Sequence, residues 1–175
     1  MNQEELEAYI RIYGKDIYSF CCSITHNRQE ADDLYQDTFL KAYELGDRVV
    51  IERNPKSFLM SIAVNLYRNY KRKLSGREKI VGISQPIEEN GAEVPDSQLI
   101  PEECIVKREE HEVVRHAVKR LPDKYRLPVL LFYMEELSIS EMAVILQLSE
   151  GTVKSRIHRA KKILKQRLEA FYYEK

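Results

Sequence analysis

The sequence contains no hydrophobic stretch long enough to cross a lipid bilayer, and it shows no signal-peptide pattern. It has only three cysteines, of which Cys21 and Cys22 are adjacent and Cys104 stands apart. That spacing matches neither a zinc site nor a disulfide framework. We therefore expect a cytoplasmic protein without a bound metal, in which at least one of the adjacent cysteines is a buried helix residue.

The motifs that carry catalysis in many enzymes are also missing. There is no Gly-rich phosphate loop, no recognisable set of Ser, His and Asp, and no pair of candidate catalytic carboxylates. His111 and His116 lie in a segment similar to a zinc-protease motif, but they are five residues apart and face different sides of a helix. The sequence predicts a protein that is not an enzyme, has no cofactor and takes no small-molecule substrate.

Net charge is absent as well, because 28 Lys and Arg residues balance 28 Asp and Glu residues. Taken alone, this balance argues against nucleic acid as a partner. The two signs are nevertheless segregated: residues 1–47 are mainly acidic, 68–79 mainly basic, 88–103 acidic, and the C-terminal part basic again. Such segregation indicates that different segments bind different partners.

What the sequence does have is apolar residues at helical spacing through most of its length. The pattern predicts helices over residues 3–23, 29–45, 56–74, 102–120 and 123–136, with a turn at 26–28. Between residues 75 and 101 the periodicity stops, and glycines, prolines and acidic residues punctuate the chain. We predict an all-α fold of two small helical domains, residues 1–75 and 105–175, joined by a flexible acidic linker over residues 76–104.

The end of the second domain has the pattern of a helix-turn-helix, which would make this domain a four-helix unit. Ser138 and Glu141 are spaced as a capping box, a turn is expected at residues 147–148, and Ser149 can cap the second helix. A stripe of apolar residues then repeats at helical spacing: Val153, Ile157, Ala160, Leu164 and Leu168.

The other faces of this second helix are suited to DNA. One face has side chains that can contact base edges in the major groove, Thr152, Ser155, Arg156 and Arg159. Another carries groups suited to phosphates, Lys154, His158, Lys161 and Lys165. No carboxylate occurs between Glu150 and Glu169. The alternative is an exposed basic helix without a ligand, but a capped helix, a short turn and a helix of one sign together favour DNA docking.

Two surfaces of the first domain stay ambiguous on composition alone. Residues 65–73 interleave aromatic side chains, cations and amides, which suits single-stranded nucleic acid; alternatively, Tyr67 and Tyr70 are half-buried packing residues on a basic helix. The helix over 29–45 carries Asp33, Gln36 and Asp37 away from its apolar face. An acidic surface of this kind is usually only a solvated face.

Taken together, these segments resemble the extracytoplasmic-function group of bacterial RNA polymerase sigma factors, in the sigma-70 family. Residues 30–43 are similar to region 2.2 of that family and residues 61–66 to region 2.3, while residues 121–126 and 150–156 are similar to regions 4.1 and 4.2. The likeness covers both predicted domains in the order of the family. It implies a protein that directs core RNA polymerase to promoters and helps to melt them.

The resemblance also implies partners and residue roles. Core polymerase would be bound through the clamp helices, contacted by Asp33, Gln36 and Asp37, and through the flap, contacted by the C-terminal domain. Melted minus-ten DNA, with an extruded base near Asn65, would be bound by Asn65, Tyr67, Arg68, Asn69, Lys71 and Arg72. Duplex minus-thirty-five DNA would be bound by Thr152, Lys154, Ser155, Arg156, His158, Arg159 and Lys161. Members of the family are typically held inactive by an anti-sigma factor, often membrane-anchored, so such a partner is expected.

Two positions depart from the family pattern. Phe58 stands where a tryptophan is usual, and Asn69 stands where an aspartate is frequent, which leaves the minus-ten sequence open. A different class of protein also remains: a stand-alone helix-turn-helix repressor or activator, which would leave the acidic helix and the aromatic-basic helix unexplained. A third reading is an interaction module whose basic helices bind an acidic protein without any need for DNA.

Overall fold

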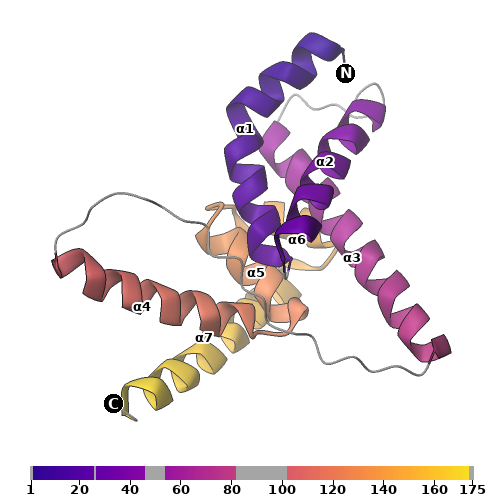
Figure 1. The fold of residues 1–175 in the computed structure, drawn as a ribbon. Coiled ribbons are helices and arrows are strands. Elements are labelled where there is room, and N and C mark those ends of the chain that lie inside the picture. Colours follow the sequence, from indigo (N-terminus) through magenta and orange to yellow (C-terminus); the bar gives the residue numbers. More distant parts are fainter. Residues whose placement is uncertain (1, 26, 46–53, 82–101, 174–175) are drawn as a thin grey trace. The chain divides into compact units, whose positions relative to one another are not determined.

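The computed structural model describes residues 2–25, 27–45, 54–81 and 102–173, with the backbone alone for 76–81, 102–110 and 171–172. Within these ranges all regular structure is α-helical, which confirms the predicted fold class (Figure 1). The helices are α1 (Gln3–Ile24), α2 (Arg28–Leu45), α3 (Pro55–Val81), α4 (Glu102–Lys119), α5 (Asp123–Tyr133), α6 (Ile139–Leu146) and α7 (Glu150–Tyr173). None of the described helices is both long and apolar enough to span a membrane.

Side-chain caps set where the first helices begin. Asn2 Oδ1 accepts a hydrogen bond from the Glu5 amide at 2.8 Å, and the Glu5 carboxylate accepts one from the Asn2 amide at 2.9 Å. This capping box satisfies two backbone donors that the start of α1 would otherwise leave without partners. At the start of α2, Asn27 Oδ1 accepts a hydrogen bond from the Glu30 amide at 2.8 Å, which satisfies one backbone donor there.

The end of the helix before the expected linker differs from the prediction. Helix α3 continues to Val81, seven residues beyond the predicted end, whereas α4 begins at Glu102, as predicted from the apolar spacing. Residues 76–81 and 102–104, assigned to the linker, are therefore helical. A single glycine such as Gly76 costs a helix only about 1 kcal/mol, so it weakened the periodic pattern without ending the helix. Helix α5 ends at Tyr133 rather than at residue 136. His26 and residues 82–101 lie outside the described residues.

The helices divide into two compact units. The first contains α1, α2 and α3 together with residues 143–148, and the second contains α4, α5, residues 139–142 and α7. In the first unit the three long helices pack against one another in pairs. Its core includes Ile17, Phe20, Cys21, Ala31, Phe39, Leu59, Ala63 and Val64. Cys21 is buried, as expected for one of the adjacent pair, and burial raises the pKa of its thiol to about 12.

Helices α1 and α2 approach closely at Gly14. A Cβ atom at this position would lie 2.9 Å from the Tyr35 hydroxyl, which is closer than real Cβ contacts allow. The ring of Tyr35 is held edge-on by Tyr18 at 5.5 Å and by Phe39 at 5.1 Å between centroids. The aromatic cluster therefore explains why a glycine stands in the middle of a helix.

We expect Gly14→Ala to lower the free energy of unfolding by about 1 kcal/mol. Overpacking costs about 1–3 kcal/mol, and the better helix propensity of alanine offsets about 1 kcal/mol of that cost. In a Tyr35→Phe background, which removes the hydroxyl, the same change should instead stabilise the protein. Urea unfolding of the four proteins of this double-mutant cycle measures both effects, and stabilisation by Gly14→Ala in both backgrounds would contradict the close contact.

The second unit has a core formed by α4, α5 and α7. Leu121, Val129 and Ala160 are buried at its centre, with Val118, Tyr125, Ile163 and Leu164 packed around them. Pro128 lies inside α5, as expected, and is buried there. The side chain of Arg126 is also buried in this unit and is only 1% exposed. Its guanidinium donates to the carbonyl of Lys119 at 3.2 Å and forms an ion pair with Asp123 at 2.6 Å.

Candidate nucleic-acid interface

The caps and the turn of the predicted helix-turn-helix are present. The Ser138 amide donates to the Glu141 carboxylate at 2.9 Å, and Ser138 Oγ accepts from the Glu141 amide at 3.3 Å. After α6, Gln147 adopts a positive φ of 54°, and the Leu148 amide donates to the carbonyl of Ala143 at 2.9 Å. Ser149 Oγ then accepts from the Thr152 amide at 3.2 Å and caps α7. The predicted caps and turn are confirmed.

Helix α7 presents one apolar face and a long polar one. Val153, Ile157 and Ala160 are buried, while Leu164 and Leu168 are partly buried. The remaining side chains between Lys154 and Lys165 are mostly exposed. The apolar stripe therefore holds the helix to its own unit and leaves the polar face to solvent.

The four candidates for base contacts are not equivalent. The Thr152 hydroxyl forms a hydrogen bond with Ser149 Oγ at 2.8 Å, and the Ser155 hydroxyl donates to the Thr152 carbonyl at 2.9 Å. Arg156 is partly buried and Arg159 is exposed, and neither forms a salt bridge within the described part of the chain. The hydroxyls of Thr152 and Ser155 already form hydrogen bonds within the first turn of α7. Among the four candidates, the guanidiniums of Arg156 and Arg159 are therefore the groups with free donors for base edges.

The four candidates for phosphate contacts also differ. Lys154 pairs with Glu150 at 4.0 Å and Lys165 with Glu169 at 3.7 Å, in exposed pairs that contribute little to stability. His158 is exposed and is not among the residues that pair. Lys161 lies over two rings of α5, with its ammonium 5.8 Å from the centroid of Phe132 and 5.5 Å from that of Tyr133. Lys161 therefore ties α7 to α5, a role that spacing along α7 could not reveal.

On α3, the structure separates the predicted strand-binding residues. Asn69 and Arg72 are exposed, and the Arg72 guanidinium donates to Asn69 Oδ1. Asn65, Arg68 and Lys71 are partly buried. Tyr67 is only 2% exposed, so its ring is part of the core and has no open face for a base. For Tyr67 the packing alternative is the one that the structure supports, because its position in the helix turns it towards the buried side.

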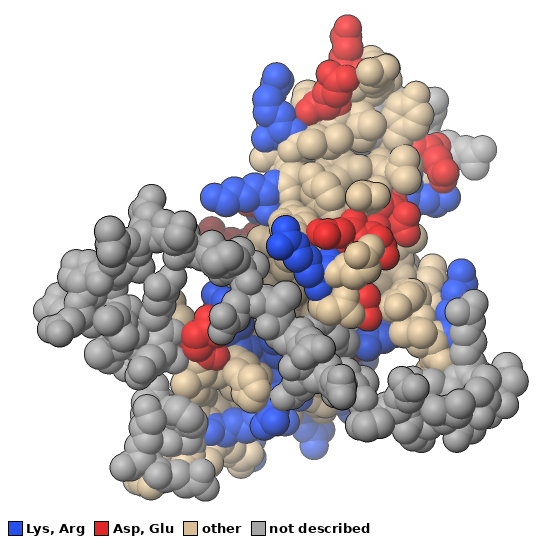
Figure 2. All heavy atoms as spheres, viewed as in Figure 1, with Lys and Arg blue, Asp and Glu red and all other residues tan. Residues whose placement is uncertain are grey.

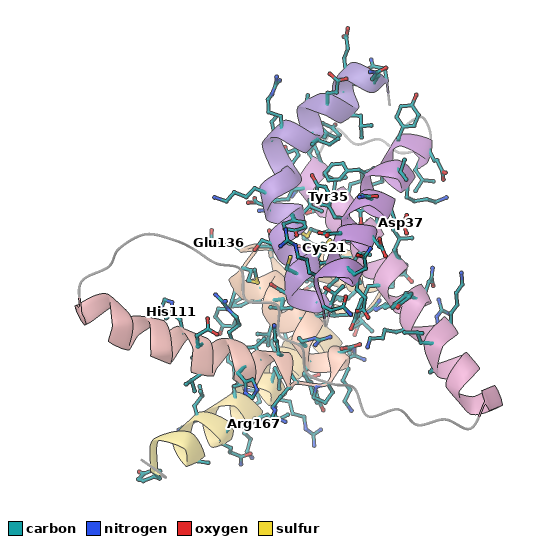
Figure 3. The ribbon with its side chains drawn as sticks, in the orientation of Figure 1. Cys21, Tyr35, Asp37, His111, Glu136 and Arg167 are labelled. Carbon is teal, nitrogen blue, oxygen red and sulfur yellow. The ribbon has the colours of Figure 1, made fainter. Side chains whose placement is uncertain are left out.

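The acidic face of α2 is fully on the solvent side. Asp33, Gln36 and Asp37 are exposed, whereas Ala31, Leu34, Thr38 and Ala42 are buried on the opposite side of the helix. Asp33 accepts a hydrogen bond from Gln29 at 3.1 Å. Carboxylates gather over the first unit in Figure 2, and Asp37 projects from α2 in Figure 3. No cationic side chain of the described residues pairs with Asp33 or Asp37, so the face is available to a basic partner.

Among the side chains that the structure describes, the remaining titratable groups form no further cluster. The Tyr18 hydroxyl donates to Asp32 Oδ1 at 2.8 Å between α1 and α2, and this hydrogen bond, followed by burial, raises the pKa of Tyr18. Among the described side chains, no group of three His, Cys, Asp or Glu residues is arranged to hold a metal ion. The side chain of Cys104 lies outside those that the structure describes.

Two family patterns and several known proteins match this chain. The pattern of sigma-70 region 2 matches residues 9–77, and that of sigma-70 region 4 matches residues 111–164. The chain is 32% identical to the ECF RNA polymerase sigma factor SigW of Bacillus subtilis, over 95% of this chain and 90% of that protein. SigM of the same organism is 31% identical, over 95% and 94%.

Solved structures share the fold. The sigma factor RpoE of Bartonella quintana, solved in complex with the anti-sigma factor NepR, superposes with a TM-score of 0.78 at 23% identity, over 95% of this chain and 98% of that one. CnrH in complex with the cytosolic domain of CnrY gives a TM-score of 0.67 at 22% identity, over 97% and 90%.

Proposed function

The chain belongs to the extracytoplasmic-function group of RNA polymerase sigma factors, in the sigma-70 family. We propose that three separate exposed surfaces bind the minus-thirty-five element, the opened minus-ten strand and core polymerase during promoter-directed initiation. The single observation that carries this proposal is the presence of regions 2 and 4, in order along the chain, with an exposed acidic face on α2 in the first and exposed cations on α7 in the second. The protein has no catalysis of its own and acts in the cytoplasm, where core polymerase and chromosomal DNA are found.

Helix α7 reads duplex DNA at the minus-thirty-five element. Arg156 and Arg159 specify bases, since a bidentate guanidinium on guanine discriminates by about 1–3 kcal/mol. Lys154, His158 and Lys165 add phosphate affinity that falls as salt rises. Thr152 and Ser155 position the start of the helix through their hydroxyls and contact DNA from there. Lys161 contributes charge from its place against α5.

Helix α3 binds the opened minus-ten strand. Asn65 and Asn69 offer amide groups to an unstacked base, while Arg68, Lys71 and Arg72 supply charge for the backbone. The hydrogen bond from Arg72 to Asn69 holds that amide in one orientation. Because Asn69 replaces a frequent aspartate, the strand meets one negative charge fewer at this point.

Helix α2 binds core RNA polymerase. Its exposed acids, Asp33 and Asp37, with Gln36 between them, exclude DNA from this face by repulsion and favour a basic protein surface. By resemblance to the family, that surface belongs to the clamp helices, and the second unit docks on the flap. An anti-sigma factor is a further partner, in keeping with the complex of RpoE with the anti-sigma factor NepR.

Transcription of sheared genomic DNA by core polymerase, with and without this protein, tests the proposed function. We expect new RNA 5′ ends that depend on the protein and share two upstream sequence elements. If no new ends appear and the protein alone binds duplex DNA tightly, the stand-alone repressor or activator is the better description. If neither occurs, the basic helices serve a protein partner instead.

A further inference from the structure

The end of α6 and the turn that follows it contact α3, although the two are far apart in the sequence. Arg68 Nη1 donates a hydrogen bond to the carbonyl of Leu146 at 2.9 Å, across 78 residues of sequence. Gln147 Nε2 donates to Asn65 Oδ1 at 3.4 Å, across 82 residues. Residues 143–148 accordingly group with α1, α2 and α3 in the first unit. The turn of the helix-turn-helix therefore meets α3 at two of its polar side chains.

The way in which α6 ends explains why Arg68 is held at this place. Two backbone hydrogen bonds close the helix in a Schellman motif, with Gln147 in the position of positive φ. Neither of these bonds uses the carbonyl of Leu146, which lies at the negative end of the helix dipole. Arg68 supplies a charged donor to that carbonyl. Because hydrogen bonds from charged groups are about twice as strong as neutral ones, the guanidinium is the main anchor of the turn.

Asn65 and Arg68 are also two of the residues that the proposed function assigns to the opened minus-ten strand. Both are partly buried, whereas Asn69, one turn further along α3, is exposed. The amide that would hold an extruded base near Asn65 already accepts a hydrogen bond from Gln147. The guanidinium of Arg68, which would pair with a phosphate, already donates to the end of α6. The turn and the strand therefore compete for the same two side chains.

We propose that the turn after α6 is an autoinhibitory cover. In the chain by itself, the turn occupies Asn65 and Arg68, and the opened strand binds only after this contact has separated. The proposal rests on the proposed function of α3, in which α2 and the second unit dock at different sites of core polymerase. Docking then supplies the free energy that separates the turn from α3. Until it does, the apparent affinity for the strand is reduced to the fraction of molecules in which the contact is open.

The test compares the free full-length protein with holoenzyme assembled from it and core polymerase. The probe is a fluorescent single-stranded oligonucleotide with the non-template sequence of a promoter mapped as above. Gln147→Gly removes the side chain that contacts Asn65, and glycine readily adopts the positive φ of this position. In the free protein it should tighten strand binding roughly 2- to 10-fold, which corresponds to the net contribution of one hydrogen bond. In holoenzyme it should have no effect, because the contact is already separated.

Glu136→Gly is the matched control. Glu136 is exposed and is the other non-glycine residue of the described chain with a positive φ, of 52°. Any effect of its lost charge on DNA acts equally on both forms, so the ratio of their affinities should stay at the wild-type value. Hydrogen exchange gives a second readout in the free proteins. Residues 65–68 of α3 should exchange faster in Gln147→Gly than in the wild type or in Glu136→Gly.

The outcomes separate the two levels of inference. If wild-type holoenzyme does not bind the strand, the proposed function of α3 fails and the cover has nothing to block. If holoenzyme binds and free Gln147→Gly has the affinity of the free wild type, the autoinhibitory role is overturned. An equal gain in holoenzyme also overturns it, since the substitution would then act on the strand directly. Equal exchange of residues 65–68 in the free wild type and Gln147→Gly overturns the contact even where strand binding of the free protein is too weak to measure.

Discussion

The double variant Asp33→Arg with Asp37→Arg should lose stable binding to core RNA polymerase while it keeps its fold. Both carboxylates are exposed on the solvent side of α2, and neither forms an ion pair within the described residues. Like charges placed against each other in an interface cost several kcal/mol, which corresponds to a loss of affinity of about 100-fold or more. Surface substitutions of this kind usually change the free energy of unfolding by no more than about 0.5 kcal/mol.

Titration of labelled core polymerase with the variant measures this affinity. A matched control is Glu4→Arg with Glu7→Arg, which makes the same change in net charge on exposed positions of α1 and should leave the affinity close to that of the wild type. Arg156→Ala is the complementary control, since it should weaken duplex recognition and leave polymerase binding intact. Unchanged co-purification of the double variant with core polymerase would remove α2 from the interface.

A second large effect is expected at Arg126. Arg126→Ala should lower the stability of the second unit by about 3 kcal/mol or more, because it opens a cavity and leaves the Lys119 carbonyl without its charged donor. The ion pair with Asp123 adds less, since that carboxylate is 42% exposed and screened by solvent. A unit of about 70 residues is stable by only roughly 4–11 kcal/mol, so this loss is a large share.

Hydrogen exchange followed by mass spectrometry reads the two units separately in the full chain. We expect faster exchange in α4, α5 and α7 of Arg126→Ala and no change in α2. Arg126→Met, which keeps most of the volume as an apolar side chain, should lose less, since apolar replacements of buried ionic groups are often tolerated. Equal protection of α5 in wild type and Arg126→Ala would show that the buried guanidinium is dispensable.

The sequence by itself determined the helices and their order. Apolar spacing located them, and the capping residues Ser138 and Ser149 marked the start of α6 and α7, because caps and periodicity depend only on residues a few positions apart. The acidic face of α2 and the basic face of α7 were also readable, since a helical register fixes which side chains share a face. The end of α3 could not be predicted from the sequence, because the residues around Gly76 are helical but do not continue the apolar spacing.

The tertiary structure decided matters that depend on residues distant in sequence. Tyr67 and Tyr70 are indistinguishable as aromatics on a basic helix, and only the point where the core ends buries one and exposes the other. Lys161 is predicted from the sequence to contact phosphates, and only the packing shows that its ammonium also lies over the rings of Phe132 and Tyr133. Arg126 belongs to a segment that resembles a family motif, and only the packing of the second unit shows that its side chain is buried. In each case the deciding free energy comes from burial against another helix, which local sequence does not specify.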